Sequence, residues 1–140
     1  MKIIQFIQEN QHNTYEIPFF MTHIAAGFPS PAQDFIEKRI DFNQLMIKHP
    51  TATYVLRITN DLMNETFFQI GDLIIVDSSQ KPKHGDIVIA NIQGEFIIKK
   101  LCLTPTLMLK PIKQNVNPII VDNPEELNIL GVVTYIIYQI

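Results

Sequence analysis

The chain has 140 residues, of which 46% are hydrophobic and 18% are charged, and its formal net charge is −3. This composition is typical of a globular protein with one hydrophobic core, and it excludes an intrinsically disordered chain. The negative charge argues against a dedicated nucleic-acid-binding protein, which would carry a clustered basic face. The single cysteine, Cys102, excludes an intrachain disulfide and is typical of a small buried side chain in a reducing compartment.

Residues 1–28 are predicted to form an arm with limited structure of its own. Its apolar start, MKIIQFI, is followed by Gln8 and Glu9, which end the run too early for a signal peptide. No apolar stretch of the chain approaches membrane-spanning length, so we expect a cytoplasmic protein that does not contact membranes. The segment Pro18–Met21 is expected to dock as a short extended piece.

Two short helices are predicted after the arm. Ser30 can cap the first, Pro31 suits its first turn, and the apolar residues up to Ile40 lie near helical spacing. Asp41 is expected to cap a second helix over residues 42–47, and His49–Pro50 ends it.

Strands are predicted from Thr51 onward. Alternation over residues 52–58 indicates a half-buried strand, and apolar runs at 73–76 and 86–90 each follow a Gly-Asp step. Residues 91–94 are typical of a hairpin loop in which Gly94 supplies a positive φ. The next strand is expected to end at the pair Lys99–Lys100, and further strands lie within 106–112, 119–121 and 131–140.

These elements predict a mainly β fold of twisted antiparallel sheets with short N-terminal helices and an extended arm. The arm covers residues 1–28 and the β domain covers residues 29–140. The last segment, 131–140, is apolar on both faces, which favours burial in its own sheet and against something else.

A lysine near the end of an apolar strand is unexpected, because burying an ammonium without a partner raises the free energy of the folded state. Lys99 alternates with Ile97 and Leu101, whereas Lys100 alternates with Ile98. The periodicity alone leaves open which of the two lysines points inward.

Five separated segments together resemble one known family. GDLIIVD (71–77), HGDIVIA (84–90) and GEFIIKKL (94–101) resemble the core of the LexA/UmuD group, the self-cleaving serine–lysine peptidases of the bacterial SOS response. AAGFPSP (25–31) and RIDFNQLMIKHPTATY (39–54) resemble segments of its UmuD members, accessory subunits of translesion DNA polymerase V. The resemblance runs from about Gly27 to the C-terminus. It implies the peptidase fold of that family and a homodimer formed through the C-terminal region.

The chain departs from the family at the nucleophile. The family carries Gly-Asp-Ser-Met where this chain carries Asn60-Asp61-Leu62-Met63, so Leu62 occupies the position of the nucleophilic serine. A leucine side chain cannot attack a peptide carbonyl. The resemblance also places Lys99 at the general-base position and Ala26–Gly27 at the bond that the family cleaves. The chain is therefore predicted to be a catalytically inactive pseudopeptidase that regulates a partner by binding it.

In two other interpretations the chain is still cleaved. The chain could cleave Ala26–Gly27 itself through a displaced nucleophile, for which Thr59, Thr66 and Ser78 are the nearest hydroxyls in sequence. It could also be a substrate that an active homologue cleaves in trans. A dimerisation module related to phage repressors is a weaker alternative, because the first 28 residues contain no helix-turn-helix pattern.

The resemblance implies three partners besides a second copy of the chain: the catalytic subunit of a translesion DNA polymerase, the RecA filament and an active UmuD homologue. No cofactor and no direct contact with nucleic acid are expected. No metal site is expected either, because the four histidines, His12, His23, His49 and His84, lack the spacing of metal ligands.

Overall fold

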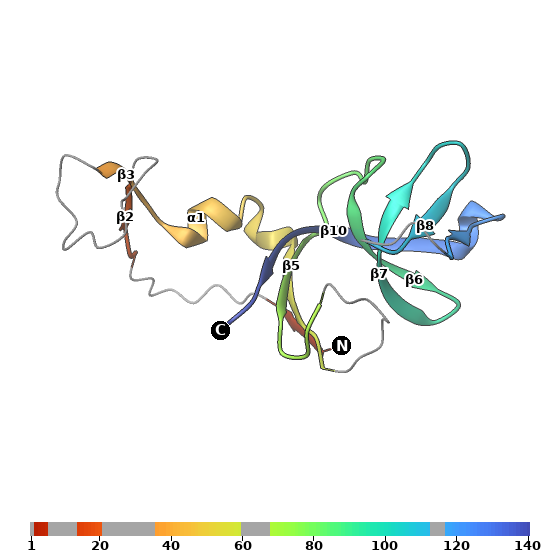
Figure 1. Ribbon diagram of the computed structural model, residues 1–140, viewed down its shortest axis with the longest axis horizontal. Helices are drawn as coiled ribbons and strands as arrows, with labels where there is room; N and C mark the ends of the chain where they lie inside the picture. Colours follow the sequence, from red (N-terminus) through yellow and green to blue (C-terminus); the bar gives the residue numbers. More distant parts are fainter. Residues whose placement is uncertain (1, 6–13, 21–35, 60–67, 113–116) are drawn as a thin grey trace. The chain divides into compact units, whose positions relative to one another are not determined.

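The computed structural model describes residues 2–5, 14–20, 36–59, 68–112 and 117–140 (Figure 1). The chain divides into two compact units, one formed by Met1–Phe6 with His49–Ile140 and the other by Ile7–Lys48. The proposed arm boundary at residue 28 and the nucleophile position Leu62 both lie outside the described residues.

The larger unit is built around one antiparallel sheet. Its strands follow the order β1-β4-β5-β10-β6-β7-β8-β9 within the described residues, and every pairing between neighbours is antiparallel. The strands are β1 (Lys2–Gln5), β4 (Thr53–Arg57), β5 (Leu73–Asp77), β6 (Ile87–Ile92), β7 (Glu95–Cys102), β8 (Met108–Lys110), β9 (Ile119–Ile120) and β10 (Leu127–Ile137). Short 3-10 turns, η2 (Pro50–Ala52) and η3 (Pro124–Glu126), precede β4 and β10. The predicted mainly β class is confirmed.

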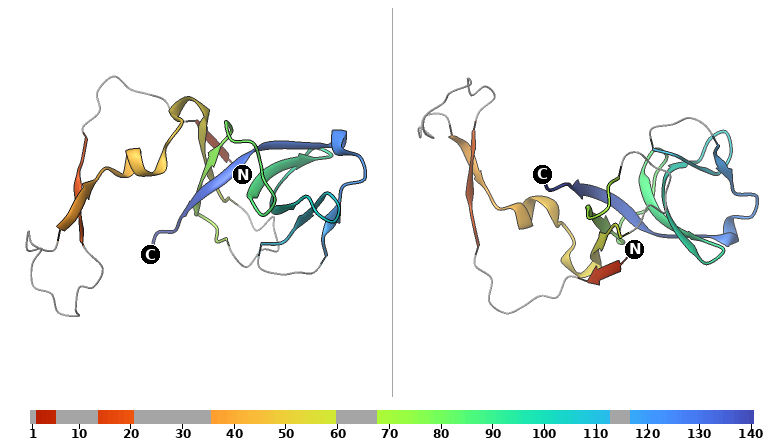
Figure 2. Two further views of the ribbon diagram at one scale, coloured as in Figure 1. Left: turned by 90° about the horizontal axis from the view of Figure 1, so that it is seen from above. Right: turned by 60° about the horizontal axis from the view of Figure 1, so that its bottom comes forward.

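Strand β10 joins the two halves of this sheet. Its first part pairs with β6, and its last part pairs with β5, so it runs through both halves as the long blue strand of Figure 2. The C-terminal strand thus begins at Leu127, earlier than predicted, and it lies between β5 and β6 in the sheet. Gly131 lies where the β6 pairing shifts register. A Cβ there would lie 2.5 Å from Val76 Cγ1 and 3.0 Å from the carbonyl oxygen of Asp77, so the close contact with β5 requires glycine.

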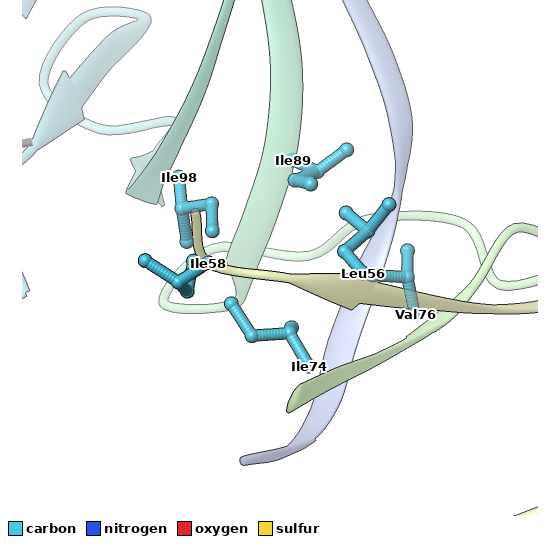
Figure 3. Close-up of a cluster of buried hydrophobic side chains, with 6 residues drawn as sticks. All are labelled: Leu56, Ile58, Ile74, Val76, Ile89 and Ile98. Atoms are coloured by element: carbon cyan, nitrogen blue, oxygen red, sulfur yellow. The ribbon is translucent and has the colours of Figure 1, made fainter. Parts of the chain in front are cut away.

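The sheet buries apolar side chains on both of its faces. One cluster contains Leu56, Ile58, Ile74, Val76, Ile89 and Ile98 (Figure 3), and the other contains Val88, Ala90, Leu101, Leu109 and Val132. Successive strand residues point to opposite faces, which is why Val88 and Ile89 enter different clusters. Cys102 is free and buried, as predicted.

The two Gly-Asp steps build the same turn. Gly71 and Gly85 have φ values of +97° and +91°, which favour glycine. The Asp72 carboxylate accepts the backbone N–H of Gln69 at 2.9 Å, and the Asp86 carboxylate accepts that of Lys83 at 2.8 Å. Each turn leads into β5 or β6, so the prediction that these steps launch strands is confirmed.

The hairpin between β6 and β7 lies where it was predicted, but β6 extends to Ile92 and the loop contains only Gln93 and Gly94. Gln93 and Gly94 both have positive φ, at 51° and 84°, as a two-residue loop between twisted strands prefers. Strand β7 continues two residues beyond the predicted end, to Cys102.

The smaller unit contains β2 (Ile17–Phe20), β3 (Ile36–Ile40) and α1 (Phe42–Met46). Helix α1 confirms the second predicted helix, and the Asp41 side chain caps it by accepting the N–H of Asn43 at 2.9 Å. The first predicted helix is wrong over residues 36–40, because these residues form β3, paired antiparallel with β2. Its start, at residues 30–35, lies outside the described residues.

Pairing with a distant strand explains why residues 36–40 are not helical. The cross-strand pair Phe19 and Lys38 places the ammonium 5.6 Å from the centre of the aromatic ring, a cation–π contact. The β2 segment supplies main-chain partners that no local pattern reveals, and these outweigh the weak helical signal of IEKRI. Strand β2 itself agrees with the extended piece predicted near Pro18.

Candidate functional site

Lys99 lies in the middle of β7, close to buried residues of the same strand. Its neighbour Ile98 has an exposed fraction of 0%, and Leu101 has 1%. Lys99 is half-buried, whereas Lys100 is exposed. Lys99 is therefore the less exposed of the two lysines. It shares its face of β7 with Leu101 of the second core cluster, whereas Lys100 shares the face of Ile98 in the first.

The pairing of β7 with β6 fixes where Lys99 lies in the sheet. Its Cα partner is Val88, which is fully buried, and the partner of Lys100 is Ile87. Lys100 also pairs with Lys110 of β8. The strand ladder therefore holds Lys99 beside a buried apolar residue in the interior of the sheet.

The other predicted site residues are not brought together by the described part of the chain. Leu62, Thr66, Ala26 and Gly27 all lie outside it. Of the hydroxyls considered as substitute nucleophiles, Thr59 is exposed. The hydroxyl of Ser78 donates a hydrogen bond to the carbonyl oxygen of Ala52 at 2.8 Å, so it closes the end of β5 against the start of β4.

A buried carboxylate at the end of β5 is the feature that the sequence did not reveal. Asp77 is 4% exposed. Its carboxylate lies 2.6 Å from the Nδ1 atom of His49 and accepts hydrogen bonds from the hydroxyl and the N–H of Ser79, at 2.6 and 2.9 Å. The side-chain amide of Gln80 donates to it at 3.2 Å. These contacts join the turn before β4 to the end of β5.

The electrostatics of Asp77 follow from these contacts. Burial acts to raise the pKa of the carboxyl, but the hydrogen bonds from Ser79, His49 and Gln80 favour the ionised form and together lower the pKa to about 2. His49 is separated from Asp77 by 28 residues, so no local motif points to the pair. The His49 side chain is 52% exposed. Asp77 holds its imidazole in one orientation.

An apolar pocket of about 320 Å³ lies within the larger unit. Its lining includes Tyr54, Leu56, Val76, Ser78, Ile89, Phe96 and Leu130. These residues supply hydrophobic contact and two hydroxyls but no carboxylate, imidazole or amine. The pocket can therefore bind an apolar group, and the residues of its lining do not include Lys99.

The described residues contain no group of three or more His, Cys, Asp or Glu side chains arranged to hold a metal ion. None of their helices is both long enough and apolar enough to cross a membrane.

Comparison with known proteins identifies the family. The model of the Peptidase S24-like family matches residues 18–134. Protein ImpA of Salmonella typhimurium is 43% identical over 127 residues, which cover 91% of this chain and 87% of the relative. Protein SamA of Salmonella typhimurium is 44% identical over 122 residues, covering 87% and 85%. Protein MucA of Escherichia coli is 36% identical over 136 residues, covering 96% and 93%. The match includes strand β7, which carries Lys99, and the chain belongs to the Peptidase S24-like family.

Proposed function

We propose that this protein is a UmuD-like accessory protein of the SOS response and translesion DNA synthesis that regulates its partner by binding and does not cleave itself. Its membership of the Peptidase S24-like family and its similarity to ImpA, SamA and MucA along most of their length support the accessory role. The proposed partners are a second copy of the chain and the catalytic subunit of a translesion DNA polymerase.

One observation carries the inactive part of this proposal. The lysine expected as general base is retained, half-buried on β7, while the position expected for the nucleophile is Leu62. A serine–lysine mechanism needs a hydroxyl whose proton the lysine removes as the oxygen attacks the carbonyl. Leucine offers neither an oxygen nor a proton, so Lys99 would be a base with no nucleophile to activate.

The hydroxyl of Ser78 is a poor substitute. It already donates to the Ala52 carbonyl at the junction of β4 and β5, and using it as a nucleophile would break that bond. It also lies on a bend after β5, whereas the family's serine precedes the Gly71–Asp72 step.

Restoring the serine provides the sharpest test. Intact mass would be measured for the full-length protein after incubation at alkaline pH, and separately with RecA filaments on single-stranded DNA. The wild type is expected to stay intact. A variant carrying Asn60→Gly and Leu62→Ser, which rebuilds the family motif, is expected to give a product that begins at Gly27.

Two matched variants assign the base. Adding Lys99→Ala to the restored protein should abolish cleavage, because the proposal assigns the role of general base to Lys99. Adding Lys100→Ala should leave cleavage unchanged, because Lys100 is the exposed neighbour. A wild-type product that begins at Gly27 would overturn the pseudopeptidase proposal.

Incubating the wild type with an active UmuD homologue shows whether a chain that does not cleave itself can still be cleaved by another protein. If the wild type is cut at Ala26–Gly27 only in the mixture, it serves as a substrate in trans, and its role as an accessory protein includes a processed form. If it stays intact there too, the full-length chain is the regulatory form. Sedimentation equilibrium tests the proposed homodimer, and titration with a translesion polymerase catalytic subunit tests the proposed partner.

A further inference from the structure

The N-terminal strand β1 is an added edge of the sheet. Lys2, Ile3, Ile4 and Gln5 pair antiparallel with Arg57, Leu56, Val55 and Tyr54 of β4. On its other side, β4 pairs with β5 in a regular register without a bulge. Without β1, therefore, β4 would itself be the edge of the sheet.

Strand β4 is built as an interior strand. Natural edge strands are usually protected from unwanted pairing by proline, by charged residues along the strand or by a bulge. The β4 sequence, Thr-Tyr-Val-Leu-Arg, has no proline, and its one charge is at its end. Thr53 and Leu56 are only 3% and 5% exposed. Uncovered, β4 would present main-chain N–H and C=O groups to any extended peptide.

The connection between β1 and β4 makes β1 replaceable. The residues between them, Ile7–Lys48, form a separate compact unit, and the chain rejoins the larger unit only at His49. Strand β1 is thus not held by a tight hairpin turn. It is 4 residues long and pairs on one side only, so few main-chain hydrogen bonds hold it in place.

We propose that the edge of β4 is a docking site for a short extended peptide of a partner protein, and that β1 of the same chain closes this site. The fitting peptide adds as an antiparallel strand, with main-chain hydrogen bonds for affinity and side chains for selectivity. The sequence of β1, Lys-Ile-Ile-Gln, is the template for that peptide: branched apolar residues at adjacent positions, flanked by polar ones. This docking site goes beyond the proposed function and does not depend on whether the chain cleaves itself.

The probe for this site is a fluorescent peptide of residues 1–8, MKIIQFIQ, titrated into full-length protein. Wild type should bind it weakly, because the apparent affinity falls with the fraction of molecules in which the site is open. A variant with Ile3→Pro and Ile4→Pro should bind it at least about tenfold more tightly. Neighbouring N–H groups of a strand point in opposite directions, so proline at two adjacent positions removes one that faces β4.

A reversible lock gives a second and independent test. Ile4 and Val55 are directly opposite, so Ile4→Cys with Val55→Cys should form a disulfide within one chain. The oxidised protein should bind the peptide at least about tenfold more weakly than the same protein after reduction. Because the two states share one sequence, this comparison stands even if the proline variant does not fold.

The controls isolate strand pairing. Gln5→Cys with Arg57→Cys places the cysteines three positions out of register, about 10 Å apart along the strands, and should not form the lock. A peptide N-methylated at Ile3 and Ile4 should not bind the opened protein. Equal peptide binding by the locked and reduced proteins would overturn the proposal. So would a disulfide that forms between two chains, since β1 would then cover β4 of a second copy.

Discussion

Replacing Asp77 with asparagine tests how a buried carboxylate stabilises the junction between β4 and β5. Hydrogen bonds from Ser79, His49 and Gln80 outweigh the effect of burial and lower the pKa of Asp77 from 3.8 to about 2. A pKa difference of one corresponds to about 1.4 kcal/mol. The ionised carboxylate therefore contributes roughly 2 kcal/mol to the free energy of unfolding near neutral pH.

The sign of the pH dependence follows from the lowered pKa. The folded state holds the proton less tightly than the unfolded state, so the contribution is fully present above about pH 5 and is lost as the pH falls toward 2. We expect the stability difference between wild type and Asp77→Asn to narrow by about 1 kcal/mol between about pH 6 and about pH 3, and by roughly 2 kcal/mol by about pH 2.

Urea unfolding followed by circular dichroism at each pH measures this difference. Asp122→Asn removes an equal charge from an exposed position, and its difference from wild type should not follow the same profile. If Asp77→Asn loses less than about 0.5 kcal/mol at about pH 6, the carboxylate is not the stabilising group. If the stability difference between wild type and Asp77→Asn stays constant down to about pH 2, ionisation of the carboxylate does not contribute to stability.

Two further predictions concern packing, and urea unfolding at neutral pH checks both. Gly131→Ala should destabilise the protein by about 1–3 kcal/mol, because its Cβ would lie 3.0 Å from the Asp77 carbonyl oxygen and β10 must move away from β5. A loss below about 0.5 kcal/mol would mean that the strands separate freely. Ile98→Ala should cost about 2–5 kcal/mol, because Ile98 is 0% exposed in the core of Figure 3. The matched change Ile120→Ala, at a side chain 60% exposed, should cost far less; equal losses would contradict this assignment of the core.

Local patterns were sufficient for most of the strands. The positive φ values of Gly71, Gly85 and Gly94 lie at the turns that the sequence marked, because few other residues adopt that conformation readily. Alternation located β4, since successive residues of a strand face opposite sides, and an apolar run after a Gly-Asp step located β6. The Asp41 cap located α1 for a similar reason, as its side chain bonds a backbone group two residues away.

Patterns of this kind were ambiguous where pairing partners are distant. Ile36 and Ile40 are four residues apart, a spacing that fits one face of a helix and equally one face of a strand. The partner strand β2 lies in a segment that the sequence marked only as extended. The order of the sheet was also beyond local reasoning: β10, at the end of the chain, inserts between β5 and β6. Its apolar character on both faces is explained in part by clusters on each side of the sheet, since Val132 belongs to one and Val133 packs against the other. The predicted homodimer remains a prediction.

The sequence by itself determined the mainly β class, the family resemblance and the identity of the residues at the expected site, because these depend on which residues are present and in what order. Only the tertiary structure decided that Lys99 is less exposed than Lys100, since both alternate with apolar neighbours and their burial depends on what covers each face of β7. It alone placed His49 against Asp77, 28 residues away, and β1 along β4. Such contacts join segments that are far apart in the chain, and they form only when the whole sheet has assembled.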